Sequence, residues 1–334
     1  MPDHIPVLLD QVLGALVPRD GEHYLDATFG AGGYTRAMLE AARCQVSAID
    51  RDPEAAAIGR AMARHYGGRL AMFHDRFCEL EKCLRSVGRD SVDGVIFDIG
   101  VSSMQIDRVE RGFSFKKDGP LDMRMEGPDA DGSSAADIVN SFDEASIGWI
   151  LRTLGEERKA RAIARAIVQA RRLVPITTTG QLAAIVARTM NGHFHNRRIH
   201  PATRSFQALR LYVNDELGEL IRGLSAAERV LRPGGRLVVV AFHSLEDRIV
   251  KTFLASRSGR IGHGSRHAPP DPVCKAAPSF TIASHKAGKP DEREVAGNRR
   301  ARSARLRTAV RTNAPAWPLD PKALGAVRLA REKG

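Results

Sequence analysis

Short apolar segments alternate with amphipathic ones along the first hundred residues. Runs rich in apolar residues and bounded by glycine or charge are typical of buried strands, whereas apolar residues three and four apart are typical of helices. The regular alternation predicts βαβ units and a parallel sheet. The predicted strands are residues 23–28, 45–50, 69–74 and 94–99, and the predicted helices are 35–43 and 53–66. We expect Asp52 to cap the second helix, with Pro53 in its first turn.

This rhythm stops at about residue 105 and does not resume before residue 202. A Gly/Asp/Ser-rich loop at 127–134 is followed by strongly helical sequence, which indicates a helical insertion. The sheet pattern resumes with a predicted long helix, 203–231, then the break Pro233-Gly234-Gly235 and a predicted strand, 236–242. Beyond Lys251 we find little periodicity until Val310.

The predicted fold is therefore of the α/β class: a doubly wound, mostly parallel sheet with an inserted all-helical domain. We predict a first part of the sheet domain, the helical insertion as a substrate-recognition domain, a second part of the sheet domain that ends in a basic segment, and a mobile tail. These domains are residues 1–104, 105–202, 203–312 and 313–334.

The charge of the chain, +12 over 334 residues, lies entirely in its C-terminal part. Residues 248–334 hold 19 Lys and Arg against 6 Asp and Glu, whereas residues 1–247 hold 32 against 33. Because Lys and Arg displace counterions from phosphates, such a block is typical of proteins that bind nucleic acid. A solvated tail is the alternative interpretation.

Cysteine spacing and hydropathy indicate a cytoplasmic protein. Cys44, Cys78, Cys83 and Cys274 match neither a zinc site nor a disulfide framework, which favours a reducing compartment. The longest apolar runs, such as 237–242, are far shorter than the ~20 residues that span a bilayer. We expect neither a signal peptide nor a membrane anchor.

The segment from Asp26 to Thr35 places a glycine-rich turn between a predicted strand and a predicted helix. This layout lets a cofactor approach the backbone at the helix N-terminus. A dinucleotide fingerprint would need a third glycine at Thr35, so the NAD interpretation loses support. Asp50 ends the next strand, where a carboxylate can accept both ribose hydroxyls of a nucleoside cofactor, and capping of the next helix suits Asp52 better. The turn alone allows several nucleoside cofactors, and the failed dinucleotide spacing, Asp50 and Asp98 at the end of the fourth predicted strand together favour S-adenosyl-L-methionine.

Asp98 ends the fourth predicted strand, at the edge where open α/β sheets bind ligands. We expect it to face the amino group of the cofactor or of the base being modified. A structural role, capping the loop through Ser102 and Ser103, is the alternative. The Asp/Asn/Ser-Pro-Pro-Tyr/Phe motif that is frequent in amino-group methyltransferases is absent. Residues outside such a motif must therefore accept hydrogen bonds from the target amine.

The helical insertion carries an arginine stripe and a histidine-rich segment. Arginines recur at intervals of 3, 4 and 7 opposite apolar residues, which predicts an amphipathic helix with a basic face. That face either contacts RNA or is merely solvated, with a pair between Glu157 and Arg161. The stripe consists of Arg158, Arg161, Arg165 and Arg172. Because His193, His195 and His200 have neither cysteine nor carboxylate neighbours, we expect no metal site.

Along most of its length the chain resembles the bacterial 16S rRNA (cytosine N4)-methyltransferases, which have a class I (Rossmann-like) methyltransferase fold and modify a decoding-region cytidine of the small ribosomal subunit. The resemblance rests on well-separated motifs. These are His4-Ile-Pro-Val-Leu-Leu9, Thr28-Phe-Gly-Ala-Gly-Gly33, Ala48-Ile-Asp-Arg-Asp-Pro53, Asp98-Ile-Gly-Val-Ser-Ser103, Arg111-Gly-Phe-Ser-Phe115, Gly119-Pro-Leu-Asp-Met-Arg-Met125, Ala202-Thr-Arg-Ser-Phe-Gln-Ala-Leu-Arg210, Phe242-His-Ser-Leu-Glu-Asp-Arg248 and Arg300-Ala-Arg-Ser-Ala-Arg-Leu-Arg307.

The resemblance implies a set of residues that contact S-adenosyl-L-methionine. They are Gly32, Gly33, Tyr34, Asp50, Phe77, Asp98 and Gln105, with Asp50 at the ribose and Phe77 against the adenine. Tyr34 stands where the family has histidine, which puts a side-chain role there in doubt. Ser205 replaces an expected threonine but keeps the hydroxyl.

For catalysis we expect Asp98, His243 and Ser244 to meet at one sheet edge, accept the hydrogens of the target amine and provide an exit for the proton. The predicted RNA contacts are the arginine stripe together with Arg204, Arg210, Arg300, Arg302 and Arg305. A DNA or small-molecule amino-methyltransferase, and a non-catalytic RNA-binding assembly factor, remain alternatives. The sequence leaves the general base, the assembly stage of the rRNA substrate and the oligomeric state open, and a homodimer is compatible with it.

Overall fold

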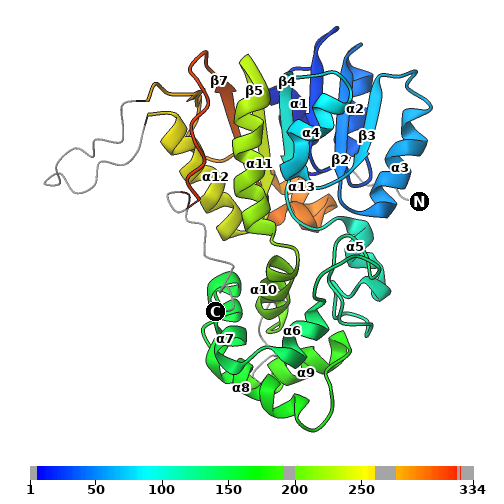
Figure 1. The fold of residues 1–334 in the computed structure, drawn as a ribbon, viewed down its shortest axis with the longest axis vertical. Helices are drawn as coiled ribbons and strands as arrows, with labels where there is room; N and C mark the ends of the chain where they lie inside the picture. The colour runs from blue at the N-terminus through cyan, green and yellow to red at the C-terminus, as the bar shows by residue number, and fades with distance from the viewer. Residues whose placement is uncertain (1–5, 191–199, 260–275, 322–323, 325–334) are drawn as a thin grey trace, which may run out of the picture. The chain divides into compact units, whose positions relative to one another are not determined.

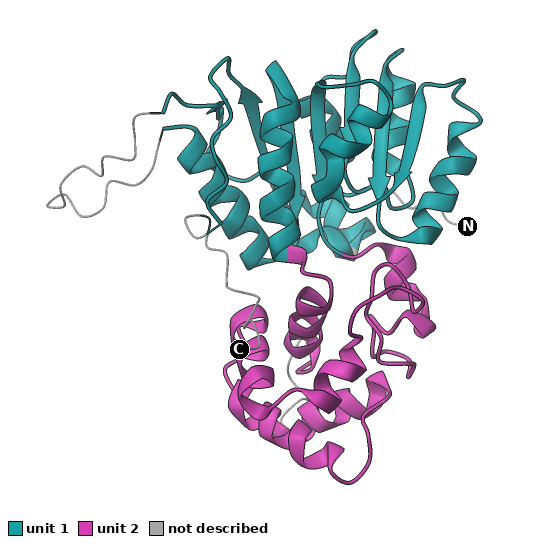
Figure 2. Ribbon diagram, viewed as in Figure 1, with its two compact units in different colours: residues 1–100, 217–326 teal, residues 101–216, 327–334 magenta. Residues whose placement is uncertain are grey.

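The computed structural model describes residues 6–190, 200–259, 276–321 and 324. By internal contacts the chain divides into two units, coloured separately in Figure 2. Unit 1 consists of residues 1–100 and 217–326, and unit 2 consists of residues 101–216 and 327–334. The domain limits predicted from the sequence stay a prediction.

Unit 1 is built on a seven-stranded sheet with the strand order β3-β2-β1-β4-β5-β7-β6 (Figure 1). The strands are β1 (His23–Asp26), β2 (Gln45–Asp50), β3 (Leu70–His74), β4 (Val92–Asp98), β5 (Leu231–Ala241), β6 (Phe280–Thr281) and β7 (Arg305–Arg311). Strands β1 to β5 pair in parallel, whereas β7 is antiparallel to both of its neighbours. The predicted doubly wound, mostly parallel sheet of the class I methyltransferase type is confirmed.

Helices connect the strands and flank the sheet (Figure 1). They are α1 (Leu9–Leu16), α2 (Gly33–Ala41), α3 (Pro53–Ala63), η1 (Phe77–Glu79), α4 (Leu80–Ser86), α11 (Glu216–Val230), α12 (Ser244–Arg257), α13 (Glu292–Gly297) and η3 (Arg299–Ser303). Asp52 caps α3 by accepting from the Glu54 N–H at 3.0 Å, and Pro53 opens that helix, as predicted. Every residue of β1 is buried, because helices cover both faces of a parallel sheet.

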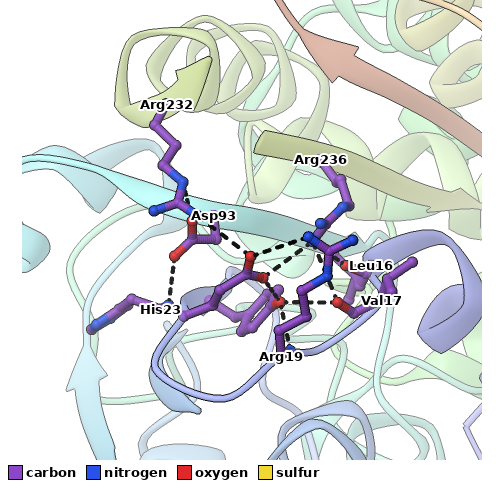
Figure 3. Close-up of polar contacts among 9 residues, drawn as sticks. Leu16, Val17, Arg19, His23, Asp93, Arg232 and Arg236 are labelled. Carbon is purple, nitrogen blue, oxygen red and sulfur yellow. Dashed lines mark hydrogen bonds and ion pairs between the residues drawn. The ribbon is translucent and has the colours of Figure 1, made fainter. Parts of the chain in front are cut away.

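An ion-pair network connects the parallel strands at their N-terminal ends (Figure 3). Glu22, just before β1, accepts from Arg236 of β5 at 3.3 Å and from Arg232 at 3.4 Å. Arg232 also pairs with Asp93 of β4, whose other oxygen accepts from the His23 N–H at 2.8 Å. These contacts hold the starts of the three central strands and leave the opposite edge for ligands.

Unit 2 consists, in its described part, of helices and loops with one isolated bridge between Pro120 and Thr178. Its helices are α5 (Ser103–Asp107), η2 (Val109–Arg111), α6 (Ala135–Ser141), α7 (Glu144–Gly155), α8 (Ala160–Arg171), α9 (Thr179–Thr189) and α10 (Thr203–Val213). The predicted helical insertion is thereby confirmed as helical. Helix α10 packs on α7.

The single helix predicted over 203–231 is wrong, because α10 and α11 are separate helices. Asp215 between them has φ +48°, in the left-handed region that ends an α-helix. The Asn214 amide accepts from the Met125 N–H and donates to the Met123 carbonyl, both over 2.8 Å, so its side chain serves a loop of unit 2.

The segment after Lys251 is more regular than its composition predicts. Helix α12 continues to Arg257, and β7 runs antiparallel to β5 from Arg305 to Arg311. In the predicted tail, the Trp317 N–H donates to buried Glu228 at 3.1 Å, and residues 322–323 and 325–334 lie outside the described residues. No described helix is both long enough and apolar enough to cross a membrane.

Candidate cofactor-binding and active site

The glycine-rich turn lies between β1 and α2 and depends on its glycines. Gly30 and Gly32 have φ of +55° and +80°, a region that side chains rarely adopt. A Cβ on Gly32 would lie 2.6 Å from the Phe29 ring, and one on Gly33 would lie 2.2 Å from Pro6 Cγ. The turn therefore packs against Phe29 and Pro6 only because Gly32 and Gly33 carry no side chain.

Asp50, at the end of β2, supports the turn from the neighbouring strand. Its Oδ2 accepts from the Gly30 N–H at 2.7 Å and its Oδ1 from the Asp52 N–H at 2.8 Å. Burial raises the pKa of Asp50 to about 6 in spite of these bonds. The structure therefore places this carboxylate beside the glycines, and ribose recognition stays a prediction.

Asp26, which ends β1, is a fully buried carboxylate that the sequence motifs did not single out. It accepts from the Thr35 hydroxyl at 2.6 Å and from the Thr28 N–H at 3.2 Å. Burial again raises its pKa to about 6. Its place at the carboxyl end of a central strand was the available signal.

Asp98 ends β4 at the same edge, and its N–H donates to the Thr28 hydroxyl at 2.6 Å. Its Oδ1 is buried and has no hydrogen-bond partner. Burial raises the pKa of Asp98 well above its ordinary value, with smaller contributions from the nearby carboxylates of Asp26 and Glu246. An unpartnered buried acceptor is costly, so this oxygen is suited to a ligand that brings a donor.

His243 and Glu246 complete the edge after β5. His243 caps α12, its Nδ1 accepting from the Glu246 N–H at 3.3 Å. Its Nε2 lies 2.9 Å from Glu246 Oε1, but without the alignment of a hydrogen bond. Glu246 Oε2 accepts from the backbone N–H groups of Phe242 and His243 at 2.8 and 3.1 Å. Because Asp98 pairs with Val240 of β5, the ends of β4 and β5 meet as expected.

Phe77 opens η1 after β3 and is held by α11. Its ring meets that of Phe97 edge to face, with centroids 5.4 Å apart. Its N–H donates to Glu219 Oε1 at 3.1 Å, and Glu219 Oε2 lies 2.8 Å from Arg51 Nη1. Burial raises the pKa of Glu219 to about 7 although Arg51 opposes the shift. Sequence reasoning missed Glu219 because its partners lie far away along the chain.

A family model described as the MraW methylase family matches residues 1–312 of this chain. The chain belongs to the MraW methylase family. It is therefore an enzyme, a methyltransferase that uses S-adenosylmethionine.

Curated relatives cover nearly the whole chain. The ribosomal RNA small subunit methyltransferase H of Parvibaculum lavamentivorans is 58% identical over 96% of this chain and 93% of its own. The protein of the same name from Paramagnetospirillum magneticum is 55% identical over 94% and 97%. Among solved structures, an rRNA methylase from Streptococcus thermophilus covers 91% of this chain and 93% of its own at 11% identity, with a TM-score of 0.39. That likeness is too distant to add to the assignment.

The residues of this methylase suit a cationic nucleoside cofactor. Three carboxylates of raised pKa, those of Asp26, Asp50 and Asp98, surround the glycine-rich turn. The buried Asp98 Oδ1 still needs a donor. A ligand with positively charged sulfonium and ammonium groups compensates such a cluster.

Two predicted cofactor contacts have other partners in the structure. The Tyr34 hydroxyl donates to the Val7 carbonyl, so this side chain holds the N-terminal segment. Gln105 lies in unit 2, where its Oε1 accepts from the Ser102 N–H at 3.1 Å in the capping box of α5. Their cofactor contacts stay predictions.

The amphipathic helix predicted for the arginine stripe is confirmed for Arg161 and Arg165, which lie in α8, whereas Arg158 precedes this helix and Arg172 follows it. Arg158, Arg161, Arg165 and Arg172 are exposed, whereas Ile163 and Ile167 of α8 are buried. Arg165 lies 3.5 Å from Glu144, and the Glu157 carboxylate accepts from the Lys159 N–H. RNA binding by this face stays a prediction.

The other predicted RNA contacts differ in exposure. Arg300, Arg302 and Arg305 are exposed in unit 1. In unit 2, Arg204 donates to the Glu156 carbonyl at 3.2 Å. Arg210 donates from Nε and Nη2 to the Glu216 carboxylate at 2.7 and 3.0 Å. A phosphate at Arg210 would have to displace Glu216.

The histidines His193 and His195 lie outside the described residues. His200 is described, and its ring lies against Phe115, with centroids 4.7 Å apart. Among the described parts of the chain, no group of three or more His, Cys, Asp or Glu side chains is arranged to hold a metal ion.

Proposed function

We propose that this methyltransferase modifies N4 of one cytidine in the decoding region of 16S rRNA, within the small ribosomal subunit and in the cytoplasm where that subunit is assembled. The relatives at 55 and 58% identity are named as small-subunit rRNA methyltransferases, and they cover the chain almost completely. The observation in this chain that carries the chemistry is the buried, unpartnered oxygen of Asp98 at the shared edge of β1, β4 and β5.

Residues of unit 1 form the main part of the proposed cofactor site. When bound, S-adenosylmethionine supplies a methyl group already activated on a sulfonium. We assign its backbone contacts to Gly32, Gly33 and Tyr34, its ribose to Asp50 and its adenine to Phe77. Gln105 of unit 2 remains a further proposed contact.

Asp98 is the proposed acceptor for the target amine. The lone pair of cytosine N4 is delocalised into the ring, so an acceptor that holds an N4 hydrogen favours attack through nitrogen. As the new N–C bond forms and the S–C bond breaks, N4 must lose one proton. A carboxylate whose pKa lies well above the ordinary range takes up such a proton more readily than an ordinary carboxylate does.

His243 and Ser244 are proposed to shape this edge after β5. Nδ1 of His243 already accepts from the Glu246 N–H. In the neutral ring the other nitrogen then carries the hydrogen, so His243 has no free lone pair for the N4 proton. We therefore assign it the positioning of the β5 end rather than proton transfer.

The base must leave its stack to reach Asp98, at a cost of a few kcal/mol. Phosphate contacts from exposed arginines can offset this cost. The proposed exposed contacts are the arginine stripe with Arg204, Arg300, Arg302 and Arg305, and half-buried Arg210 would join them only after release from Glu216.

Transfer of a labelled methyl group to three acceptors tests the proposal. We expect transfer to small subunits that lack the methylation, and none to DNA or free nucleosides. Asp98→Asn should lower single-turnover transfer at saturating cofactor by at least about 100-fold, within the range for loss of an acid–base group. Near-normal transfer by this variant would refute the role of Asp98, and methylated DNA or nucleosides would refute the substrate.

A further inference from the structure

The two most exposed large apolar side chains of the described residues are adjacent. Leu173 is 86% exposed and Val174 is 62% exposed, whereas the other exposed large apolar residues lie between 36 and 44%. Both follow directly after α8 in unit 2. Two adjacent exposed apolar side chains indicate a binding surface more strongly than a single exposed leucine does.

Leu173 borders a groove between α8 and α9, which pack against each other (Figure 1). From α8 the groove is lined by Ala166, Gln169 and Ala170, and from α9 by Ile185 and Arg188. Its volume is about 250 Å³. The small alanine side chains keep this groove open and apolar, while Gln169 and Arg188 supply hydrogen-bond donors at its walls.

The surroundings of the groove are strongly basic. Residues 160–189 contain five arginines and neither Asp nor Glu. Arg161 and Arg165 are exposed on the face of α8 that adjoins the groove-lining positions, Arg172 is exposed just after α8, and Arg188 is exposed on α9. Arg165 lies 3.5 Å from Glu144, and the remaining exposed arginines still give the border of this apolar groove a positive charge. Such a groove is complementary to a nucleobase followed by phosphates.

We propose that the α8–α9 groove receives an unstacked nucleobase of the rRNA substrate, at a position other than the methylated cytidine. This inference rests on the proposed function, because it takes rRNA to be the partner. The base lies against Leu173 and the alanines, and the planar guanidinium of Arg188 can stack on it and donate to its phosphate. The exposed arginines of α8 contact the adjoining phosphates.

Two single substitutions separate the apolar and the charged parts of this site. Leu173→Ser removes the apolar rim, and the exposure of this side chain keeps the cost to folding small. Arg188→Gln removes the charge from the α9 wall. The matched controls in unit 1 are Val87→Ser, at a side chain 42% exposed, and Arg64→Gln, at an exposed arginine. Thermal unfolding verifies that all four variants fold.

The readouts are the KM and kcat for unmethylated small subunits and the Kd for protein-free small-subunit rRNA by filter binding. We expect each groove variant to raise KM and Kd by about ten-fold, in line with the loss of one stacked base, while kcat changes less than two-fold. Arg188→Gln should also reduce the salt dependence of rRNA binding by about one phosphate contact, and Leu173→Ser should not. The controls should stay within two-fold.

Unchanged KM and Kd in both groove variants would overturn the inference. A defect on subunits that disappears on protein-free rRNA would also overturn it, because the partner would then be a ribosomal protein. Failure of the wild-type enzyme to methylate small subunits would instead refute the proposed function, and the Kd for protein-free rRNA would still test the groove.

Discussion

The N–H of Asp98 donates to the hydroxyl of Thr28 over 2.6 Å, and this bond joins the end of β4 to the segment that follows β1. Thr28 is bound in turn, since its own N–H donates to Asp26. The proposed acceptor of the methylated amine is therefore held by the strand that carries the glycine-rich turn. Positioning of this kind is the main contribution that a protein can make when the methyl group is already activated.

Thr28→Val should remove the hydrogen bond between these two segments without changing the shape of the side chain. The Asp98 N–H would lose its acceptor, so we expect the free energy of unfolding to fall by about 1 kcal/mol. Single-turnover transfer should fall by about ten-fold, because misplaced catalytic groups lose rate steeply. Thr28→Ser keeps the hydroxyl and should retain both properties, and equal defects in the two variants would contradict this role.

Asp26→Asn should stabilise the cofactor-free protein at neutral pH. The pKa of Asp26 is about 6 in the folded chain, above the value of about 3.9 for an unfolded chain. The folded state therefore binds more protons between these values, and its stability falls as pH rises from about 4 to about 6. Asparagine can accept from the Thr28 N–H through its oxygen and donate to the Thr35 hydroxyl through its amide nitrogen, so it replaces both hydrogen bonds without the buried charge.

Chemical denaturation of both proteins at pH 5 and pH 7.5 measures this effect. The difference of about two pKa units corresponds to at most about 3 kcal/mol in favour of the variant at pH 7.5, and to less at pH 5. A variant that is less stable than the wild type at pH 7.5 would show that the buried carboxylate stabilises the fold.

Glu219→Gln should weaken cofactor binding more than it slows transfer. Glutamine can still accept from the Phe77 N–H, but it loses the charge that holds Arg51 at 2.8 Å. We expect the Kd for S-adenosylmethionine, measured by calorimetry, to rise about five-fold, which corresponds to about 1 kcal/mol. Since the pKa of Glu219 is about 7, the wild type should approach the variant at pH 6.

Glu81→Gln is the matched control, because Glu81 pairs with Arg229 at 2.7 Å at a more exposed position. Exposed pairs contribute about 0–1 kcal/mol, so this variant should keep the affinity for the cofactor. Equal losses in the two variants would mean that Glu219 acts through general stability and not by holding Phe77.

The arginine stripe, which begins before α8 and ends just after it, should make rRNA binding depend steeply on salt. Replacing Arg158 and Arg161 together by Gln should reduce the slope of log K against log salt by about 2, roughly one for each lost phosphate contact. Arg60→Gln, at an exposed arginine of α3, should leave the slope unchanged. An unchanged slope in the double variant would assign this face to solvent.

The sequence was sufficient to predict the parallel part of the sheet, because buried parallel strands have long apolar runs. It was insufficient for β7, in which Arg305, Arg307 and Arg311 share a short strand with the buried Leu306 and Ala309. The Arg311 guanidinium donates to four backbone carbonyl groups. A basic segment whose composition is compatible with a solvated tail is therefore a packed strand.

Site residues at the ends of strands could be predicted from the sequence, whereas residues whose roles depend on contacts with distant parts of the chain could not. Asp50 and Asp98 were predicted because ligands of open sheets bind at the carboxyl ends of strands. Glu219 and Glu246 were missed because their roles arise from contacts with Phe77 and with the end of β5. Nothing in the local sequence distinguishes these two glutamates from solvent-exposed ones.

The substrate and the role of Asp98 can be tested together by mass spectrometry of 16S rRNA from a strain without this protein and from the same strain with it restored. We predict that one cytidine in the decoding region lacks a methyl group on N4 in the first strain and regains it in the second. Restoration with Asp98→Asn should leave that cytidine unmodified. An unchanged methylation pattern in the strain without the protein would show that this cytidine is not its substrate.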